Sequence, residues 1–396
     1  MASQSVRSAL WFLHRWIGIS LAVLLVPIAV SGALLVWHDH LDAVINPHRY
    51  AVTGAQVAQP LSVYLGSAAQ VLPEGLRPAG VRFPASEGWP VVVTARGAPR
   101  AQGGPPRFFN VYLDPPTAHV LDVVDFRASL VGWLHRFHEN LTVPEYSGRA
   151  VVGWVGVAML ILSLSGIWLW WPRNGAFLPG LRWGRSAHTT TNLHHLLGFW
   201  ISVPLAVVSA TGIYLGFPQQ ARSLLSSVAP MNPQGPRPNA GAIARDVRLT
   251  PEAAFDLAAK EQTNVRPVVI FLPTVSASGG ERGRARGEAT DPGEGASPIW
   301  RVQFRSLQSG DLITLTVNDR TGALARSPGP LAGDRAAQWI RSIHEGSRGG
   351  PLWQFIVFLT GVFPAVFVVT GIVMWLRGRR ARSALAATQN KLQAAE

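Results

Sequence analysis

The chain has 396 residues, of which 48% are hydrophobic and only 14% are charged, well below the roughly 25% of a typical soluble domain. The net charge is +13, but much of the excess lies beside apolar segments, where membrane proteins place it, so composition favours a membrane protein and argues against nucleic-acid binding. The absence of cysteine excludes thiolate-bound metal centres, thiol nucleophiles and disulfides. Any bound metal must therefore rely on the 11 histidines and on carboxylates.

Four stretches are apolar over the length that a bilayer requires, which is about 20 residues. We expect transmembrane helices within 1–37, with the apolar part at 11–37, and at 150–171, 193–217 and 352–376. Trp and Tyr cluster at the ends of these stretches, as in an aromatic belt. The first is too long for a signal peptide and has no small-residue cleavage site, so we interpret it as a retained anchor.

Arginines predict which side of the membrane each connecting segment occupies. They lie before the first span, in the short segment 172–192 and in the tail 377–396, and short arginine-rich segments favour the cytoplasm. Both termini are therefore predicted to be cytoplasmic, with the protein in a bacterial inner membrane. The long segments 38–149 and 218–351 would then be periplasmic.

The chain contains one unit twice. The motif LHRWIG at 13–18 opens the first span and returns as LHHLLG at 193–198, which opens the third. WLHRFHE at 133–139 precedes the second span, and WIRSIHE at 339–345 precedes the fourth. We expect these last two motifs on interfacial helices within 133–149 and 339–351. Each span also carries a small pair: Ser31-Gly32, Ser165-Gly166, Thr211-Gly212 and Thr370-Gly371.

The outer segments 38–132 and 218–338 repeat as well. RPAGVRFP at 77–84 matches RPVVIFLP at 266–273, and a strand, turn and strand follow in each copy at 111–121 and 315–324. Helices are predicted near 62–71 and 251–260, so each outer domain should be a small helix on an antiparallel sheet. Segment 276–297 has no counterpart in the first copy and is predicted to be a disordered insertion. The predicted fold is an α-helical multi-pass membrane protein, with four transmembrane helices in two parallel repeats and two extracytoplasmic α+β domains.

Four histidines occupy equivalent positions in the two copies. His14 and His194 lie near the cytoplasmic ends of spans one and three, and His138 and His344 lie on the predicted interfacial helices. Two neutral imidazoles from facing helices are what a six-coordinate haem iron requires. Gly18 and Gly198 follow the inner histidines by four residues on the same helix face, where a missing side chain lets a flat ring approach. The competing interpretation is that a duplicated unit simply inherits structural histidines.

Other histidines are weaker candidates for metal binding. His38 and His40 end the first span beside Asp39 and Asp42, and they could form an outer metal site, replace an axial ligand or be solvated. His135 precedes His138 by three residues and could share its helix face. The sequence identifies no catalytic acid, base or nucleophile.

The combined pattern resembles a known family. The Leu-His-x-x-x-Gly starts, the Ser/Thr-Gly pairs, the WWPR exit at 170–173 and the Asp-Pro-x-Thr turn at 114–117 look like the PepSY-associated transmembrane family over nearly the whole chain. The resemblance implies outer PepSY domains and, as in siderophore-iron reductases of the family, b-type haem at the membrane-associated histidines His14, His138, His194 and His344. Two features depart from the pattern: Ala118 replaces the usual turn glycine, and the His38-Asp39-His40 cluster is additional.

The expected function is reduction of a periplasmic ferric siderophore for iron acquisition, through two haems b. No dinucleotide-binding fingerprint occurs, and segment 172–192 is too short for a Rossmann unit of about 30 residues, so the electron donor should be a quinol or a separate cytoplasmic reductase. The alternative is a haem-free PepSY-type regulator that inhibits or senses peptidases. A transporter is a further alternative, which the lack of charge at the middle of the spans disfavours.

Overall fold

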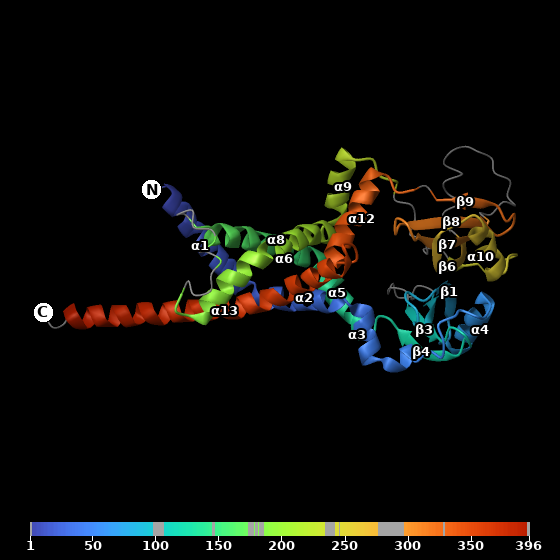
Figure 1. The fold of residues 1–396 in the computed structure, drawn as a ribbon, viewed down its shortest axis with the longest axis horizontal. Coiled ribbons are helices and arrows are strands. Elements are labelled where there is room, and N and C mark those ends of the chain that lie inside the picture. Colours follow the sequence, from blue (N-terminus) through green and yellow to red (C-terminus); the bar gives the residue numbers. More distant parts are fainter. Residues whose placement is uncertain are drawn as a thin grey trace. The chain divides into compact units, whose positions relative to one another are not determined.

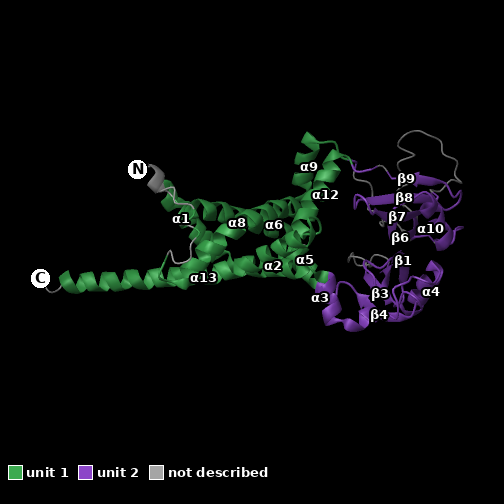
Figure 2. Cartoon of the chain, in the orientation of Figure 1, with its two compact units in different colours: residues 1–38, 133–231, 331–396 green, residues 39–132, 232–330 purple. Residues whose placement is uncertain are grey.

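The computed structural model describes residues 2–97, 107–144, 147–172, 178, 181, 186–233, 242–244, 246–275, 297–327 and 329–393. The chain divides into two compact units (Figure 2). Unit 1 comprises 1–38, 133–231 and 331–396, and unit 2 comprises 39–132 and 232–330. Almost all of the predicted insertion at 276–297, and much of segment 172–192, lies outside the described residues.

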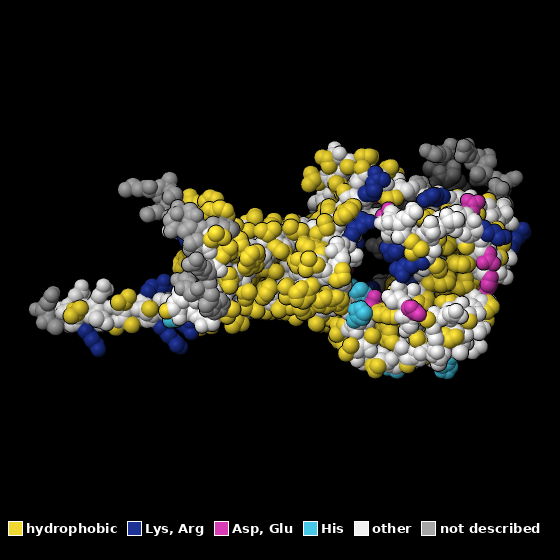
Figure 3. Space-filling view, viewed as in Figure 1, with side chains coloured by type: hydrophobic (Ala, Val, Ile, Leu, Met, Phe, Trp, Pro, Cys, Tyr) yellow, Lys and Arg dark blue, Asp and Glu magenta, His cyan; other side chains and the backbone are white. Residues whose placement is uncertain are grey.

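Unit 1 is a helical bundle with an apolar exterior (Figures 1 and 3). Three of its helices are long and apolar enough to cross a membrane: α6 (Gly148–Trp170), α8 (Thr189–Gly216) and α13 (Gly350–Gln393). A fourth span results if α1 (Ala2–Ser20) and α2 (Ala22–Leu35) count as one bent pair. The shorter helices are α5 (Leu130–Asn140), α9 (Pro218–Val228) and α12 (Ala332–Glu345), and α3 (His38–Ile45) begins at the boundary with unit 2.

The first predicted span is not one continuous helix. A break at Leu21 separates α1 from α2, and the two halves are bent by 72°. The halves pack on different neighbours, since α1 contacts mainly α6 whereas α2 contacts mainly α13. The bend therefore lets one short apolar segment contribute to two helix pairs.

Glycines allow the spans to approach closely. A Cβ added at Gly216 of α8 would lie 2.7 Å from the Cα of Gly153 on α6, and one at Gly361 of α13 would lie 2.6 Å from the carbonyl oxygen of Ala29 on α2. Membrane helices associate through such small residues because lipid provides little hydrophobic driving force between helices. These contacts fix the pairs α6–α8 and α2–α13.

Helix α13 continues beyond the predicted end of the fourth span at 376. Its 44 residues correspond to about 66 Å at 1.5 Å per residue, compared with a hydrocarbon core of about 30 Å. The tail after Gly378 contains neither glycine nor proline in the described residues and is rich in Ala, Leu, Arg and Gln, which are good helix formers. The second half of α13 is therefore a polar helix rather than a span.

Among its described residues, unit 2 forms one antiparallel sheet of nine strands, in the order β4-β3-β2-β1-β6-β7-β8-β9, with β5 paired to β6. The first four strands are β1 (Leu76–Arg82), β2 (Val91–Gly97), β3 (Phe108–Leu113) and β4 (Val120–Asp125). The second copy supplies β5 (Ala242–Ile243), β6 (Val265–Val275), β7 (Ile299–Ser306), β8 (Leu312–Asn318) and β9 (Leu324–Arg326). The two outer modules thus share one sheet, which sequence analysis does not predict.

Strands β1 and β6 join the modules around one pair of equivalent residues, Val81 and Ile270. Val81 lies opposite Ile270, with Gly80 opposite Phe271 and Arg82 opposite Val269. A side chain at Gly80 would lie 2.6 Å from the carbonyl oxygen of Ile270, so the junction requires glycine at this position.

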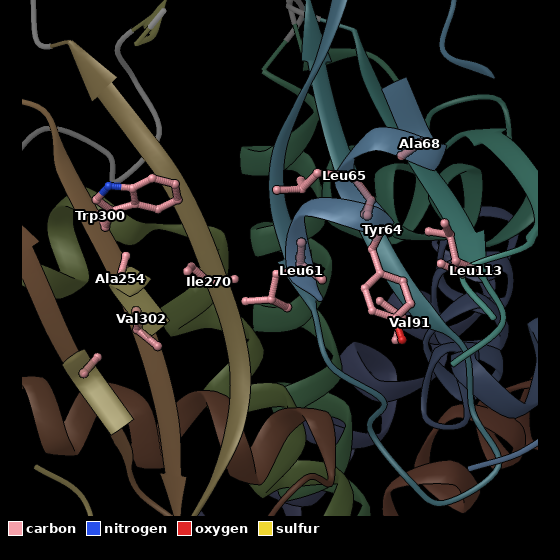
Figure 4. Close-up of a cluster of buried hydrophobic side chains, with 14 of the residues drawn as sticks. Leu61, Tyr64, Leu65, Ala68, Val91, Leu113, Ala254, Ile270, Trp300 and Val302 are labelled. Carbon is pink, nitrogen blue, oxygen red and sulfur yellow. The ribbon is translucent and has the colours of Figure 1, made fainter. Parts of the chain in front are cut away.

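The helices predicted at 62–71 and 251–260 are confirmed as α4 (Leu61–Val71) and α10 (Pro251–Lys260). They cover one face of the sheet, where both modules contribute to one hydrophobic core (Figure 4). Tyr64 of α4, Ile270 and Trp300 are almost fully buried in this core. A 3-10 turn at Pro47–Tyr50 precedes α4.

A buried aspartate follows the strand in each copy and binds the segment that leads into the helix. Asp114 accepts hydrogen bonds from the Thr53 amide and hydroxyl, both at 2.7 Å, and from the Thr117 hydroxyl. Asp319 accepts them from the amides of Arg248 and Leu249 and from the Trp300 indole. Burial alone would raise the pKa of Asp114, but the hydrogen bonds from Thr117 and Thr53 outweigh it and hold the pKa below its usual range.

Replacing Asp114 by alanine should destabilise unit 2 by about 2–4 kcal/mol, because charge-assisted bonds are lost and the Thr53 amide is left without its acceptor. Since the folded-state pKa is lowered, this contribution is present above the unfolded pKa of about 3.9 and disappears as pH falls through the folded value. Faster hydrogen exchange around Thr53 in the full-length protein measures the effect. Asp256→Ala, at an exposed site on α10, is the control, and equal exchange in both variants would contradict this assignment.

Candidate metal centres

The inner histidines are each held by a Ser/Thr-Gly pair on a neighbouring span. His14 on α1 places Nδ1 2.9 Å from the Ser165 hydroxyl of α6, and a Cβ at Gly166 would lie 3.4 Å from its Cε1 atom. His194 on α8 places Nδ1 2.8 Å from the Thr370 hydroxyl of α13, and the corresponding distance at Gly371 is 3.8 Å. The hydroxyl orients each ring, and the glycine provides the space in which it lies.

The outer histidines follow the same arrangement. His138 on α5 has Nδ1 2.9 Å from the Ile28 carbonyl and 3.4 Å from the Ser31 hydroxyl on α2. Its ring lies over Gly32, where a Cβ would come within 2.6 Å of Cε1.

The second copy repeats this contact at His344 on α12. Its Nδ1 is 3.0 Å from the Val208 carbonyl and 3.2 Å from the Thr211 hydroxyl on α8. A Cβ at Gly212 would lie 3.0 Å from its Cε1 atom. Each of the four Ser/Thr-Gly pairs recognised in the sequence therefore contacts the ring of one histidine.

These hydrogen bonds assign one tautomer to all four rings. A carbonyl only accepts, so His138 and His344 must donate from Nδ1. The Ser165 hydroxyl already donates to the Leu162 carbonyl, and the Thr370 hydroxyl donates to the Val366 carbonyl, so these oxygens accept from Nδ1 of His14 and His194. Each Nε2 then keeps a lone pair, which is the arrangement found in metal-binding histidines.

The four rings form two pairs, and each pair contains one histidine from each copy of the repeat. The ring centroids of His14 and His194 are 6.4 Å apart, and those of His138 and His344 are 6.2 Å apart. An imidazole nitrogen binds a first-row metal at about 2.0–2.1 Å, and the ring centre lies about 1.1 Å behind that nitrogen, so two axial imidazoles place their centres about 6.3 Å apart. Both separations therefore suit a single metal ion between two axial ligands.

The inner pair borders a cavity of about 460 Å³, within the range of about 300–1,000 Å³ that is typical of cofactor sites. Gly18 and Gly198 line it, as the sequence predicts. An added Cβ would meet nothing within 4 Å at Gly198 and only a leucine methyl at 3.9 Å at Gly18. The space beside both histidines is therefore open to a flat ring, and side chains at these two positions would fill it.

One end of this cavity is basic. Arg7, Arg15 and Arg382 line it together with Trp11 and Trp375. Arg7 donates to the Leu169 carbonyl, whereas the buried Nε atom of Arg15 has no hydrogen-bond partner in the described part of the chain. The cavity thus combines an apolar body with positive charge at one end.

Burial affects the protonation of the outer pair. It lowers the pKa of His138, and it lowers that of His344 to about 4, with the neighbouring His138 acting in the same direction. Both imidazoles are therefore neutral near pH 7. This is the protonation state that a metal ligand requires.

The weaker histidine candidates are not brought into either pair. His38 donates from Nδ1 to the Leu35 carbonyl, and the centroids of the His38 and His135 rings are 5.4 Å apart. His40 packs against Trp89 in unit 2. Within the described residues, no three or more His, Asp or Glu side chains gather as a metal cluster.

The sequence shows the Ser/Thr-Gly pairs but does not predict their role. Their hydroxyls and glycines position histidines. The signal that could have revealed this role was the number of pairs, since four pairs accompany four repeated histidines. Glu139 and Glu345, which directly follow the outer histidines in the sequence, form ion pairs with Arg149 and Arg341.

A family model described as the PepSY-associated TM region matches residues 11–378, so the chain belongs to this family of membrane proteins. No curated protein matches the chain.

Replacing Gly32 by alanine should force His138 away from α2, because the new methyl group would lie 2.6 Å from its ring. Such overpacking costs about 1–3 kcal/mol, so the thermal unfolding midpoint in detergent should fall. Gly378→Ala on α13 meets nothing within 4 Å and should be neutral or slightly stabilising. An unchanged thermal unfolding midpoint for Gly32→Ala would show that the His138 ring does not lie over Gly32.

Proposed function

We propose that this protein is a haem-containing reductase, which carries electrons across the bacterial inner membrane to a periplasmic ferric siderophore and so releases ferrous iron. The observation that carries the proposal is the pair of imidazoles at each of two levels in the helical bundle, with centroids 6.4 and 6.2 Å apart and every Nδ1 bound by a neighbouring helix.

His14 and His194, which border the cavity, would hold one b-type haem, and His138 and His344 would hold a second. When bound, such a group supplies a one-electron carrier whose potential depends on its axial ligands and burial. The chain itself fixes ring orientation through the Nδ1 bonds, and it leaves space at Gly18 and Gly198.

The positive end of the inner cavity supports the same assignment. Haem carries propionate carboxylates, and Arg7 and Arg15, which line this end of the cavity, are suited to bind them.

The two histidine pairs are spaced to serve a membrane crossing. Along α8, His194 belongs to the inner pair, whereas Val208 and Thr211 hold His344 of the outer pair. These positions are 14 and 17 residues from His194, or about 21–26 Å at 1.5 Å per residue. This distance covers most of a hydrocarbon core of about 30 Å.

Topology and partners follow from the charges and from the sequence. The arginines that follow Trp375 on α13 support a cytoplasmic C-terminus, with unit 2, formed by the two PepSY-like modules, in the periplasm. Four membrane crossings then require that α1 and α2 together form one span.

The electron donor would be a quinol or a separate cytoplasmic reductase. Each electron would reduce one ferric ion to ferrous iron, which hard oxygen chelators bind weakly.

Haem content of histidine variants tests the proposal. The full-length protein, purified in detergent from haem-supplemented cells, should contain about two six-coordinate b-haems per chain, as two pairs of axial ligands require. His14→Ala or His194→Ala should remove one haem, and His138→Ala or His344→Ala should remove the other. His119→Ala, on an exposed turn of unit 2, should retain both.

Reduction is tested by adding a ferric siderophore to the anaerobically reduced protein and following ferrous iron with a ferrous-specific chelator. A colourless protein from haem-supplemented cells would exclude the reductase. The outer modules would then be tested as a haem-free peptidase-binding regulator.

The hydroxyls that orient the inner histidines should tune haem binding. Ser165→Ala and Thr370→Val remove the Nδ1 acceptors, and loss of such a partner typically weakens metal affinity about 10–100-fold. Thr370→Ser keeps the hydroxyl and should restore affinity. Haem retention during dialysis against apomyoglobin, together with the midpoint potential, measures the effect; equal retention in Thr370→Val and Thr370→Ser would contradict it.

A further inference from the structure

We propose that helix α9 (Pro218–Val228) lies in the surface of the lipid bilayer at the end of α8, with its apolar side among the acyl chains and its polar side toward water. The partner of its exposed apolar side is therefore lipid. The helix belongs to unit 1, although it follows the predicted end of the third span at 217. The inference uses the membership of the chain in a family of membrane proteins and is independent of haem.

The sequence of α9 divides its surface into two sides. At 100° per residue, Ala221, Leu224, Leu225 and Val228 fall within an arc of about 100°. The glutamines and serines of the helix occupy the opposite side, and its sequence contains no acidic residue. This division is typical of a helix that lies along the boundary between an apolar phase and water.

The bundle covers only part of this apolar side. Ala221 and Leu225 are half-buried, whereas Leu224 is 72% exposed and Val228 is 77% exposed. The structure describes every residue of α9, and none of them is buried. With 11 residues, α9 belongs to the isolated helices shorter than about 12–15 residues that are marginal in water. A further apolar partner would therefore stabilise it.

Helix α9 begins where a candidate membrane span ends. The non-helical backbone of Phe217 ends α8, and Pro218 stands in the first turn of α9, a position that proline favours. The ring centroids of Phe217 and Trp154 are 5.7 Å apart, and Trp154, near the start of α6, is 65% exposed. Exposed tryptophans near the ends of spans mark the membrane interface. Because α9 turns away from the direction of α8 (Figure 1), it leaves the bundle at this level.

Lipid is the partner that this position supplies. Only Phe217 separates α8 from α9, so the helix cannot move away from the end of the span. Unit 1 has an apolar exterior, and hydrophobic side chains are exposed on α9 as well (Figure 3). A stable interface with a second copy needs about 800 Å² from each partner, and two exposed aliphatic side chains provide far less.

The position of α9 bears on the helix that carries His344, because the segment after α9 is bound to α12. The Gly333 amide of α12 donates to the Pro230 carbonyl at 2.9 Å, and a side chain at Gly333 would collide with Met231. The other end of α12 places His344 against the Val208 carbonyl of α8. Lipid bound to α9 would thus help to hold the start of α12 at the membrane surface.

Spin labels test the inference, since the absence of cysteine allows single labelling sites. Labels at Leu224→Cys and Val228→Cys are compared with labels at Ser223→Cys and Ser226→Cys, which are matched controls on the polar side. All four positions are exposed, so labelling leaves the packing of α9 intact. The full-length protein is placed in nanodiscs of phosphatidylethanolamine and phosphatidylglycerol. Collision rates with oxygen, which dissolves in lipid, and with a water-soluble nickel complex give the depth of each label.

The labels at positions 224 and 228 should lie about 5–10 Å below the headgroup level, with both control labels on the aqueous side. Equal access of the nickel complex to all four labels would show a solvated helix and overturn the inference. Low access of both reagents to positions 224 and 228 would show that protein covers them, which also rejects lipid. Spin–spin coupling that disappears on dilution with unlabelled protein would identify that cover as a second copy.

Discussion

The arrangement of unit 1 depends on the hydrogen bond that each of four histidines makes through Nδ1 to a neighbouring membrane helix. An imidazole in an apolar bundle needs a partner for its N–H group, and here a carbonyl or a hydroxyl provides it within 3.0 Å in every case. The glycine beside each hydroxyl removes the atoms that would otherwise occupy the position of the ring. The contact of each histidine with its hydrogen-bond acceptor and the neighbouring glycine thus determines the tautomer of the imidazole, the orientation of its ring and the spacing of the two helices.

The same contact explains why the duplication matters. Each copy anchors its own two repeated histidines, since His14 is bound by Ser165 and His138 by Ile28 in the first copy. These histidines, however, pair only with their equivalents in the other copy. A pair made in this way is held by the bundle as a whole, and loss of either half removes both histidine pairs.

Much of this could be predicted from the sequence. Apolar length identified α6, α8 and α13, and alternating strands with helices near 62–71 and 251–260 identified the α+β modules, because local periodicity and turn chemistry determine these elements. The break at Leu21 could not be predicted, since it depends on α1 and α2 packing against different helices. The shared sheet could not be predicted from the sequence either. Strands β1 and β6 pair residues about 190 positions apart in the chain, and nothing in either strand alone indicates its partner at the sheet edge.

The pairing of Val81 with Ile270 has a consequence for the origin of the protein. Equivalent residues meet there, as equivalent histidines meet in unit 1, and this is the contact pattern of an isologous dimer, in which the same surface patch of two identical subunits forms the interface. A half-length ancestor with this sequence pattern would have assembled as a symmetric homodimer, with every shared site on its two-fold axis. In the present chain Arg82 stands where the other half has Phe271, so the two sides of this junction differ in charge although their backbones pair symmetrically.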